Sequence, residues 1–393
     1  MKKLNRRELL RLSAGAALAA GATPLLNGCG EETAETEPAP SPTSPSSAAK
    51  VINPSAVAAV KGTDLAVMAR EALEALGGIG TVVNEGESVF IKPNFVTLGW
   101  AQYGRNPFVT GECTKVELVA AVAEECLKVG ASEVTIGDGG QVPTWDWAYA
   151  TTLDGSTNLK AIAEQLSAQY GRKVTLACLE TDSPGWDEVP SKSEEMGKIA
   201  VSNLVTSADR IISIPVLKTH QWAQLTLALK NFTGTTPLAR YGANNDGTRP
   251  RILLHLASGG IEQCFLDVVT AVRPDLAIID ASICVEGDGP SAGGGKGLTV
   301  DMKQRLGSWL LLASRDLVAI DATTARIISH DVLTVKHIGM AYEQGLGEMR
   351  VEEIELVGAR LDDLRVDWVA ATPASPTELS RHQQYCPFTV AHV

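Results

Sequence analysis

From Val51 onward, short apolar runs of strand length alternate along the chain with amphipathic stretches of helix length. We predict helices at 64–76, 114–129, 159–170, 260–272 and 316–329, and strands at 88–91, 133–136, 174–178, 210–214, 276–280 and 309–313. This alternation is typical of α/β proteins, in which a mainly parallel sheet carries helices on both faces. We therefore predict a single α/β domain over residues 51–393.

Local signals refine this pattern. Thr114 and Glu117 have the spacing of a capping box at the start of their helix. The second half of the segment 221–231 has the pattern of a further helix. The segments 235–251 and 287–297 are predicted as long loops, which in a compact domain more often serve a function than merely connect elements.

The first 28 residues have the features of an export signal. A basic start is followed by an uncharged apolar stretch, 12–26, which is shorter than the about 20 residues that a membrane-spanning helix needs. The segment 5–11 resembles a twin-arginine signal, and 26–29 resembles a lipoprotein cleavage box. We predict that residues 1–28 are removed and that Cys29 is lipidated. An ordinary secretory signal with an incidental cysteine is the alternative.

Residues 29–50 are predicted to form a flexible linker. After Cys29 the segment is rich in Pro, Ser, Thr and Glu and contains no large apolar side chain, so it cannot bury a core. We therefore expect the folded domain in the cell envelope, attached to the membrane through the lipid on Cys29. The formal net charge of −12 argues against a nucleic-acid partner, which would require a basic surface.

Polar side chains follow four of the predicted strands directly. They are Lys92, Asn94, Asp138, Lys218, His220, Asp280, Glu286 and Asp288. The carboxyl ends of parallel strands lie along one edge of a sheet, and ligands bind there in α/β proteins. We therefore expect these side chains to converge on one site. The alternative is that strand ends require polar turn residues in any case.

Lys218 and Lys230 lie in apolar sequence although the chain is acidic overall. Lysines in this setting favour a bound carboxylate or phosphate, which they hold as point charges. We predict that the catalytic residues are His220, Lys218 and Asp138, and that the substrate-binding residues are Lys92, Asn94, Lys230 and Asn231. In this hypothesis His220 moves a proton. A metal-ligand role and a purely structural role remain as alternatives for His220.

Asp280, Glu286 and Asp288 offer the oxygen ligands that hard divalent cations prefer. A divalent metal is therefore one alternative for a cofactor, and turn-forming acids beside glycine are the other interpretation of these residues. The sequence has no Cys-x-x-Cys pair, which argues against an iron–sulfur cluster. Neither a P-loop nor a dinucleotide-binding fingerprint is complete.

Several blocks of this sequence resemble the signature blocks of the domain of unknown function 362 family. They are Lys92-Pro93-Asn94, Ile136-Gly137-Asp138, Pro215 to His220, Leu227 to Gly234, and the stretches 280–293 and 313–321. The resemblance covers roughly residues 85–350 and implies that these polar residues form a shared site, without naming a reaction. Some members of the family carry an added iron–sulfur module, which this sequence lacks.

Three functions remain open from the sequence. The first is an exported enzyme that binds a small anionic substrate through lysines and a histidine, with or without a metal. The second is a redox or metallocofactor protein, which the twin-arginine signal favours because that route exports folded proteins, often with a cofactor already inserted. The third is a tethered solute-binding lipoprotein without catalytic activity, which the lipid anchor and the flexible linker favour.

Overall fold

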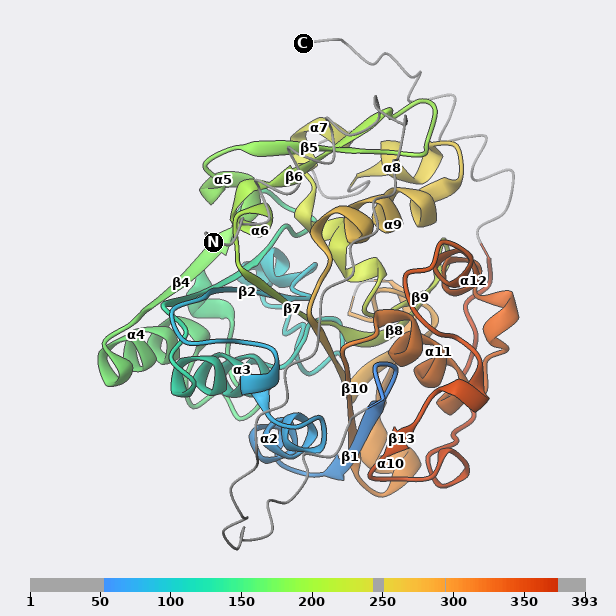
Figure 1. Ribbon diagram of the computed structural model, residues 1–393, viewed down its shortest axis with the longest axis horizontal. Coiled ribbons are helices and arrows are strands. Elements are labelled where there is room, and N and C mark those ends of the chain that lie inside the picture. Colours follow the sequence, from blue (N-terminus) through green and yellow to red (C-terminus); the bar gives the residue numbers. More distant parts are fainter. Residues whose placement is uncertain (1–52, 243–250, 294, 374–393) are drawn as a thin grey trace, which may run out of the picture.

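The computed structural model of the chain describes residues 53–242, 251–293 and 295–373 (Figure 1). The predicted signal, the linker and Cys29 lie outside the described residues. Over the ranges that the structure describes, no helix is both long enough and apolar enough to cross a membrane. Lipid attachment at Cys29 stays a prediction.

A mixed sheet forms the centre of the molecule, with the strand order β13-β1-β12-β10-β7-β2-β3-β4. Its strands are β1 (Val57–Gly62), β2 (Ser88–Pro93), β3 (Glu133–Asp138), β4 (Lys173–Cys178), β7 (Arg210–Ile214), β8 (Val216–His220), β9 (Gln224–Thr226), β10 (Leu276–Asp288), β11 (Lys296–Asp301), β12 (Trp309–Ser314) and β13 (Leu356–Val357). The run from β10 through β7, β2 and β3 to β4 is parallel. By contrast, β12 pairs antiparallel with both β1 and β10. The prediction of a mainly parallel α/β sheet is confirmed.

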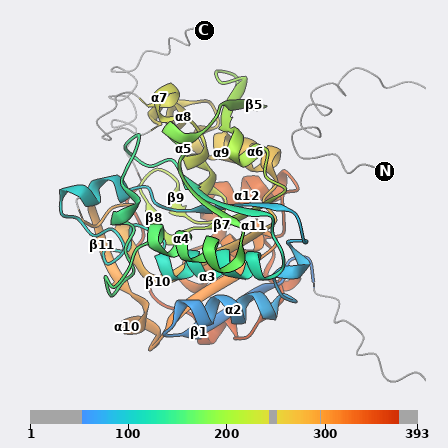
Figure 2. The ribbon, with the colours of Figure 1, turned by 90° about the vertical axis from the view of Figure 1, so that its left-hand side faces the viewer.

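Helices cover both faces of this sheet. On one face α2 (Leu65–Ala75), α3 (Val116–Lys128) and α4 (Leu159–Tyr170) pack side by side, as Figure 2 shows. On the other side of β10 lie α9 (Gly260–Val272), α11 (Leu317–Ile327) and α12 (Lys336–Glu343) (Figure 1). The shorter helices are α5 (Leu179–Asp182), α6 (Asn203–Thr206), α7 (Leu238–Tyr241), α8 (Ile252–Leu256) and α10 (Met302–Leu306), and the small separate sheet pairs β5 (Trp186–Pro190) with β6 (Lys198–Ser202). Cover on both faces explains why β8 and β12 are buried along their whole length.

The helices at 159–170 and 260–272 are confirmed, but the predicted capping box of α3 is wrong. The helix begins at Val116, and no side chain caps it. Thr114 instead donates its hydroxyl proton to the carbonyl oxygen of Ile214 at 2.6 Å, and Glu117 accepts from the backbone of Leu153. Bonds between distant segments therefore replace the local capping bonds.

The helix predicted in the second half of 221–231 is also wrong. β8 and β9 form an antiparallel hairpin there, and a 3-10 segment, η4 (Lys230–Thr235), follows. Leu225, Thr226 and Leu227 are all buried, and since successive side chains of an extended segment point to opposite faces, this segment is enclosed on both faces. A segment that is buried on all sides has no amphipathic pattern, which is the signal by which a surface helix is predicted. Tertiary contacts then determine its local structure.

Both segments that were predicted as long loops contain regular structure. β10 continues to Asp288, and β11 begins at Lys296 and pairs with it antiparallel, so most of 287–297 belongs to a hairpin. Within 235–251, α7 forms a short helix, and residues 243–250 lie outside the described part of the chain. The strand predicted to end at Asp280 continues, so Glu286 and Asp288, which were expected after it, also lie within β10.

Candidate functional site

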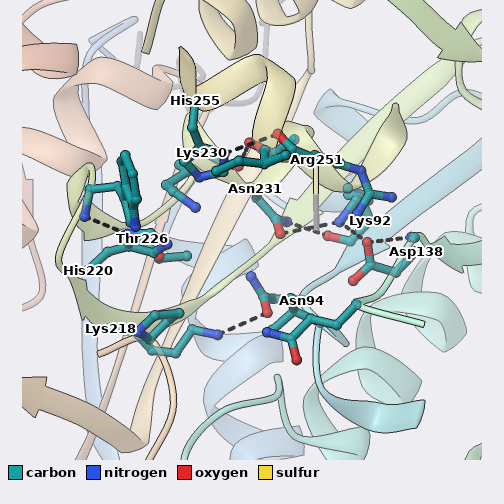
Figure 3. Close-up of a pocket in the computed structure, with 18 residues that line it drawn as sticks. Lys92, Asn94, Asp138, Lys218, His220, Thr226, Lys230, Asn231, Arg251 and His255 are labelled. Carbon is teal, nitrogen blue, oxygen red and sulfur yellow. Dashed lines mark hydrogen bonds and ion pairs between the residues drawn. The ribbon is translucent and has the colours of Figure 1, made fainter. Parts of the chain in front are cut away.

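A cavity of about 250 Å³ opens at the carboxyl ends of β2 and β3, beside the β8–β9 hairpin, η4 and α8. All seven side chains predicted as catalytic or substrate-binding line it (Figure 3): Lys92, Asn94, Asp138, Lys218, His220, Lys230 and Asn231. The sheet edge and the hairpin thus bring together residues that are widely separated in sequence. The roles of the individual side chains follow from their hydrogen bonds.

Lys92 and Asp138 form a buried ion pair in the wall of the cavity. Lys92 Nζ lies 2.5 Å from Asp138 Oδ1, and the two side chains are 1% and 2% exposed. The same amine donates to the carbonyl oxygen of Pro93 at 2.8 Å and to Asn231 Oδ1 at 3.3 Å. An ammonium group has three protons, and these acceptors use all of them. Lys92 is therefore placed to fix the wall, whereas the sequence suggested that it holds substrate.

Asp138 is equally occupied. Its carboxylate accepts from the backbone N–H of Phe95 at 2.6 Å and of Gly139 at 2.7 Å, in addition to the pair with Lys92. Gly234 closes over this pair, because a Cβ added there would lie 3.0 Å from Lys92 Nζ and closer still to Asp138 Oδ1. Only glycine fits this position. The geometry makes Asp138 an ion-pair partner and a backbone anchor, and it leaves the predicted catalytic role without support.

Asn231 completes the wall and has no polar atom left for a ligand. Its Nδ2 donates to the carbonyl oxygen of Lys92 at 2.8 Å and to Ser213 Oγ at 3.1 Å, while its Oδ1 accepts from the Lys92 amine. Both halves of the amide are used. The expected substrate-binding role of Asn231 is therefore indirect at most, through the position it gives to Lys92.

Lys218 keeps one proton available. Its Nζ donates to Asn94 Oδ1 at 3.1 Å and to the carbonyl oxygen of Glu112 at 2.6 Å, which leaves a third proton for a ligand. The amide nitrogen of Asn94 also has no partner among the described residues. Burial lowers the pKa of Lys218 to about 8. This amine can therefore donate a proton near neutral pH.

His220 is held in one tautomer. Its Nδ1 accepts from the backbone N–H of Trp222 at 3.1 Å and of Ala223 at 3.4 Å, within the β8–β9 turn. Backbone N–H groups only donate, so in the neutral ring the proton is on Nε2. Burial, followed by the charge of Lys230, holds the pKa of His220 well below its ordinary value. His220 is thus a neutral hydrogen-bond donor at the cavity, which favours stabilisation of an oxygen over the predicted transfer of a proton.

Lys230, the first residue of η4, differs from the other two lysines. Over the described ranges its amine has neither a hydrogen bond nor an ion pair, although the residue lines the cavity (Figure 3). Burial, followed by the positive charge of Lys218, lowers the pKa of Lys230 to about 7. A large fraction of the amine is therefore unprotonated at neutral pH.

Sequence reasoning missed Arg251, which is 3% exposed and lines the same cavity. Its Nε donates to the carbonyl oxygen of Thr236 at 2.9 Å and its Nη1 to that of Gly140 at 2.9 Å. Its Nη2 is buried and has no partner within the described residues. Arg251 also has a φ of 54°, a left-handed conformation that is uncommon outside glycine and that clusters at functional sites.

Thr226 in β9 is a second residue that the sequence did not single out. Its Oγ1 is buried at the cavity and has no partner in the described part of the chain. His255 from α8 also lines the cavity, with its ring centroid 6.4 Å from that of His220 in a stacked arrangement. Neither residue belongs to a recognisable motif. Arg251 lies at the end of the segment 235–251, whose length was the one signal pointing to it.

The predicted metal ligands do not share this site. Asp280 pairs with Lys115 at 3.3 Å, and Glu286 pairs with Arg305 at 2.7 Å. Asp288 accepts from the backbone of Thr372 at 2.7 Å. Among the residues that the structure describes, no group of three or more His, Cys, Asp or Glu side chains is arranged to hold a metal ion. The interpretation of these three acids as a metal site is therefore not supported.

The unpaired polar groups of the cavity are of one kind. Those identified above are Asn94 Nδ2, the third proton of Lys218, His220 Nε2, Thr226 Oγ1, the amine of Lys230 and Arg251 Nη2. Each of them can donate a hydrogen bond, and the hydroxyl of Thr226 and the unprotonated amine of Lys230 can also accept one. The carboxylate that lines the described cavity, Asp138, is neutralised by Lys92. The complement of such a cavity is an anion.

These features define the class: an α/β protein with a cationic cavity at the carboxyl ends of its parallel strands. Residues 89–326 match the family model described as Domain of unknown function (DUF362), and the chain belongs to this family. The matched range contains every residue that lines the cavity.

Similar proteins include a thylakoid-associated protein of Synechocystis sp. It is 27% identical over 290 residues, which cover 72% of this chain and 76% of the relative. Among solved structures, the lactate racemase apoprotein of Thermoanaerobacterium thermosaccharolyticum is similar with a TM-score of 0.34 and 11% identity over 63% of this chain and 54% of that chain. A protein of Thermotoga maritima is similar with a TM-score of 0.32 and 13% identity over 62% and 56%. The match thus spans little more than half the length of each solved chain.

Proposed function

We propose that this chain is an enzyme that acts on a small organic anion. The observation that carries the proposal is that the unpaired groups identified in the cavity can all donate a hydrogen bond, whereas the carboxylate among the described lining residues is neutralised by Lys92. A buried cavity of this kind is a poor site for a cation and a good site for a carboxylate or a phosphate.

In this proposal Arg251 contacts the acid group of the substrate. The guanidinium stays charged over the physiological pH range, so its unpaired Nη2 is a constant source of charge-assisted hydrogen bonds. Lys218 and the Nε2–H of His220 donate to an oxygen on which negative charge develops during the reaction. Donors fixed in advance in a buried site stabilise such charge more effectively than water does.

Lys230 supplies the reactive group. Its amine has no partner among the described residues and is partly unprotonated at neutral pH, so we assign it the role of the base. His220 is not available for this task because its Nδ1 is held by two backbone N–H groups. The sequence predicted the same anion-binding enzyme but gave the basic role to His220, and the hydrogen bonds favour Lys230 instead.

The proposal is tested by anion binding and turnover. Small carboxylates, phosphate esters and sulfate are screened by thermal shift, and the affinity of each binder is measured by calorimetry. We expect Arg251→Ala to weaken binding by about tenfold to a hundredfold, since a charge-assisted bond contributes about 1.5–3 kcal/mol. Arg240→Ala is the matched control, because Arg240 lies outside the cavity and pairs with Glu188.

Turnover is followed by NMR on the anions that bind, with Lys230→Ala as the inactive reference. Conversion by the wild-type chain that Lys230→Ala lacks supports the proposal. If no anion binds, the proposal is wrong. Tight binding without any conversion supports instead the solute-binding alternative that the sequence left open.

We also propose that residues 1–28 direct export and that Cys29 carries a lipid anchor. The sequence pattern supports this, and the Synechocystis relative is named for an association with thylakoids. Labelling of cells with a tagged fatty acid provides the test. Cys29→Ser is expected to abolish the label and release the protein from the membrane fraction, whereas Cys386→Ser is expected to retain both. Retention of the label in Cys29→Ser contradicts the proposal.

A further inference from the structure

We propose that Lys230 is a covalent catalyst, and that its amine forms an iminium with the carbonyl carbon of a small oxo acid bound in the cavity. This inference rests on the proposed function and deepens it, because it names the substrate class and the bond that forms. It follows from what surrounds the amine.

The amine of Lys230 is exposed to the cavity and otherwise unengaged. In contrast to Lys92, which has three acceptors, it has no acceptor among the described residues. An amine that attacks carbon must have its lone pair available, which a hydrogen bond to a carboxylate would prevent by keeping the group protonated. Burial and the neighbouring positive charge of Lys218 both act in the direction of the unprotonated form. This is the environment in which lysines act as nucleophiles.

The same surroundings match the other end of an oxo acid. The Nη2 of Arg251, which has no partner among the described residues, is available for the carboxylate. Val96, Ile252 and Pro290 supply apolar wall for a short carbon chain. The iminium is positively charged, and the cavity already carries positive charge. The negative charge of the bound carboxylate balances the iminium and so stabilises it.

The step is balanced without a further reactant. The nitrogen lone pair of Lys230 forms the new C–N bond, the electron pair of the C=O bond moves onto oxygen, and that oxygen takes up a proton. The nitrogen loses one proton, a second proton is delivered to the hydroxyl, and one molecule of water leaves as the C=N bond forms. The ammonium of Lys218 has an available proton for this delivery, and the Nε2–H of His220 stabilises the oxygen before it leaves. No oxidation or reduction occurs.

Reductive trapping tests the proposal. The purified full-length chain is incubated with glyoxylate, pyruvate or 2-oxoglutarate, treated with borohydride, and analysed by intact mass and peptide mapping. We expect one adduct per chain, on the peptide that contains Lys230, with the mass of the oxo acid less one oxygen atom. Propionate, which has a carboxylate but no carbonyl, is expected to protect Lys230 from the adduct without forming one.

Variants separate nucleophilic chemistry from charge. Lys230→Arg keeps a cation but loses the amine, so it is expected to lose the adduct while it still binds propionate. The matched control is Lys198→Arg, which removes a lysine that is 65% exposed on β6 and is expected to keep the adduct. Thermal melting of each variant confirms that it is folded, and Lys230→Met is a second variant in case the arginine does not fit.

The outcomes distinguish this inference from the proposed function. If carboxylates bind and no oxo acid of the panel is trapped at Lys230, the inference is wrong, while anion binding in the cavity stands and turnover decides whether the chain is an enzyme. If neither carboxylates nor oxo acids bind, both fail. Trapping on exposed lysines alone, unchanged in Lys230→Arg, also overturns the inference.

Discussion

The carboxyl group of Asp321 accepts a hydrogen bond from the backbone N–H of Leu229 at 3.0 Å, one residue before Lys230. Its other oxygen accepts from the backbone N–H of Ala228 at 2.8 Å. Asp321 lies on α11, more than ninety residues further along the chain, and it is fully buried. A helix that contributes nothing to the lining of the cavity therefore fixes the backbone from which the unpaired lysine projects.

Asp321→Ala is expected to destabilise the chain. It leaves two buried backbone N–H groups without acceptors, and each unpaired group costs about 1–3 kcal/mol. The free energy of unfolding in urea measures this effect. Asp363→Ala is the control, because Asp363 is exposed and lies outside the site. Equal stability of Asp321→Ala and the wild-type chain would contradict the assignment.

Sulfate affinity is expected to fall as the pH rises through about 7 and 8, the values to which burial lowers the pKa of Lys230 and Lys218. Each lysine loses its charge in this range, whereas sulfate keeps its own, so the attraction weakens. Formation of the oxo-acid adduct is expected to change in the opposite direction near pH 7, because it needs the unprotonated amine of Lys230. Calorimetry and trapping over one pH series measure both. Sulfate affinity that rises with pH would contradict this prediction.

Lys92→Met is expected to lower the free energy of unfolding. Any loss of ligand affinity is expected to result from this lower stability and not from a lost contact with the ligand. Removing one partner of a buried ion pair typically costs about 3–5 kcal/mol, because the remaining charge stays buried without compensation. The variant also removes the donor to Asn231 Oδ1. Urea unfolding and sulfate calorimetry on the same sample separate the two effects. A variant that unfolds like the wild type and yet fails to bind sulfate would restore the substrate-binding role that the sequence suggested.

Two substitutions at His220 separate its two nitrogen atoms. In His220→Asn the side-chain oxygen lies near the position of Nδ1 and is expected to accept from Trp222 and Ala223 as before. The variant therefore keeps its stability but loses the Nε2–H donor at the cavity. Gln places an NH₂ group near Nε2 and is expected to keep the donor but to weaken the turn. Thermal melting and turnover of the two variants provide the comparison. If His220→Asn is fully active, the Nε2–H has no part in the reaction.

Much of the fold was accessible from the sequence because its local signals are strong. The helices predicted from residues 64 and 316 begin one residue later, and Asp64 and Asp316 cap them, each side chain accepting from two backbone N–H groups of the first turn. The polar residues after the strands also converge as expected, because a parallel sheet places the ends of its strands along one edge. These features depend on short-range chemistry or on a general property of the fold.

The remaining features depend on contacts that the sequence does not encode locally. The hairpin of β8 and β9 replaces a predicted helix because Leu225 and Leu227 are enclosed and Asp321 binds the backbone of the segment that follows. Similarly, no pattern separates the fully paired Lys92 from the unpaired Lys230. The difference arises from Asp138 and Asn231, which reach one amine and not the other.

The excess of cationic groups over free carboxylates in the described cavity has a consequence for how the protein is handled. Several positively charged groups confined in about 250 Å³ require electroneutrality, so the folded chain is expected to retain a counter-ion from any solution that contains a suitable one. Such an anion stabilises the folded state by mass action. The measured melting temperature then depends on the anions in the buffer. The protein must therefore be exchanged extensively into chloride before the thermal shifts of different ligands are compared.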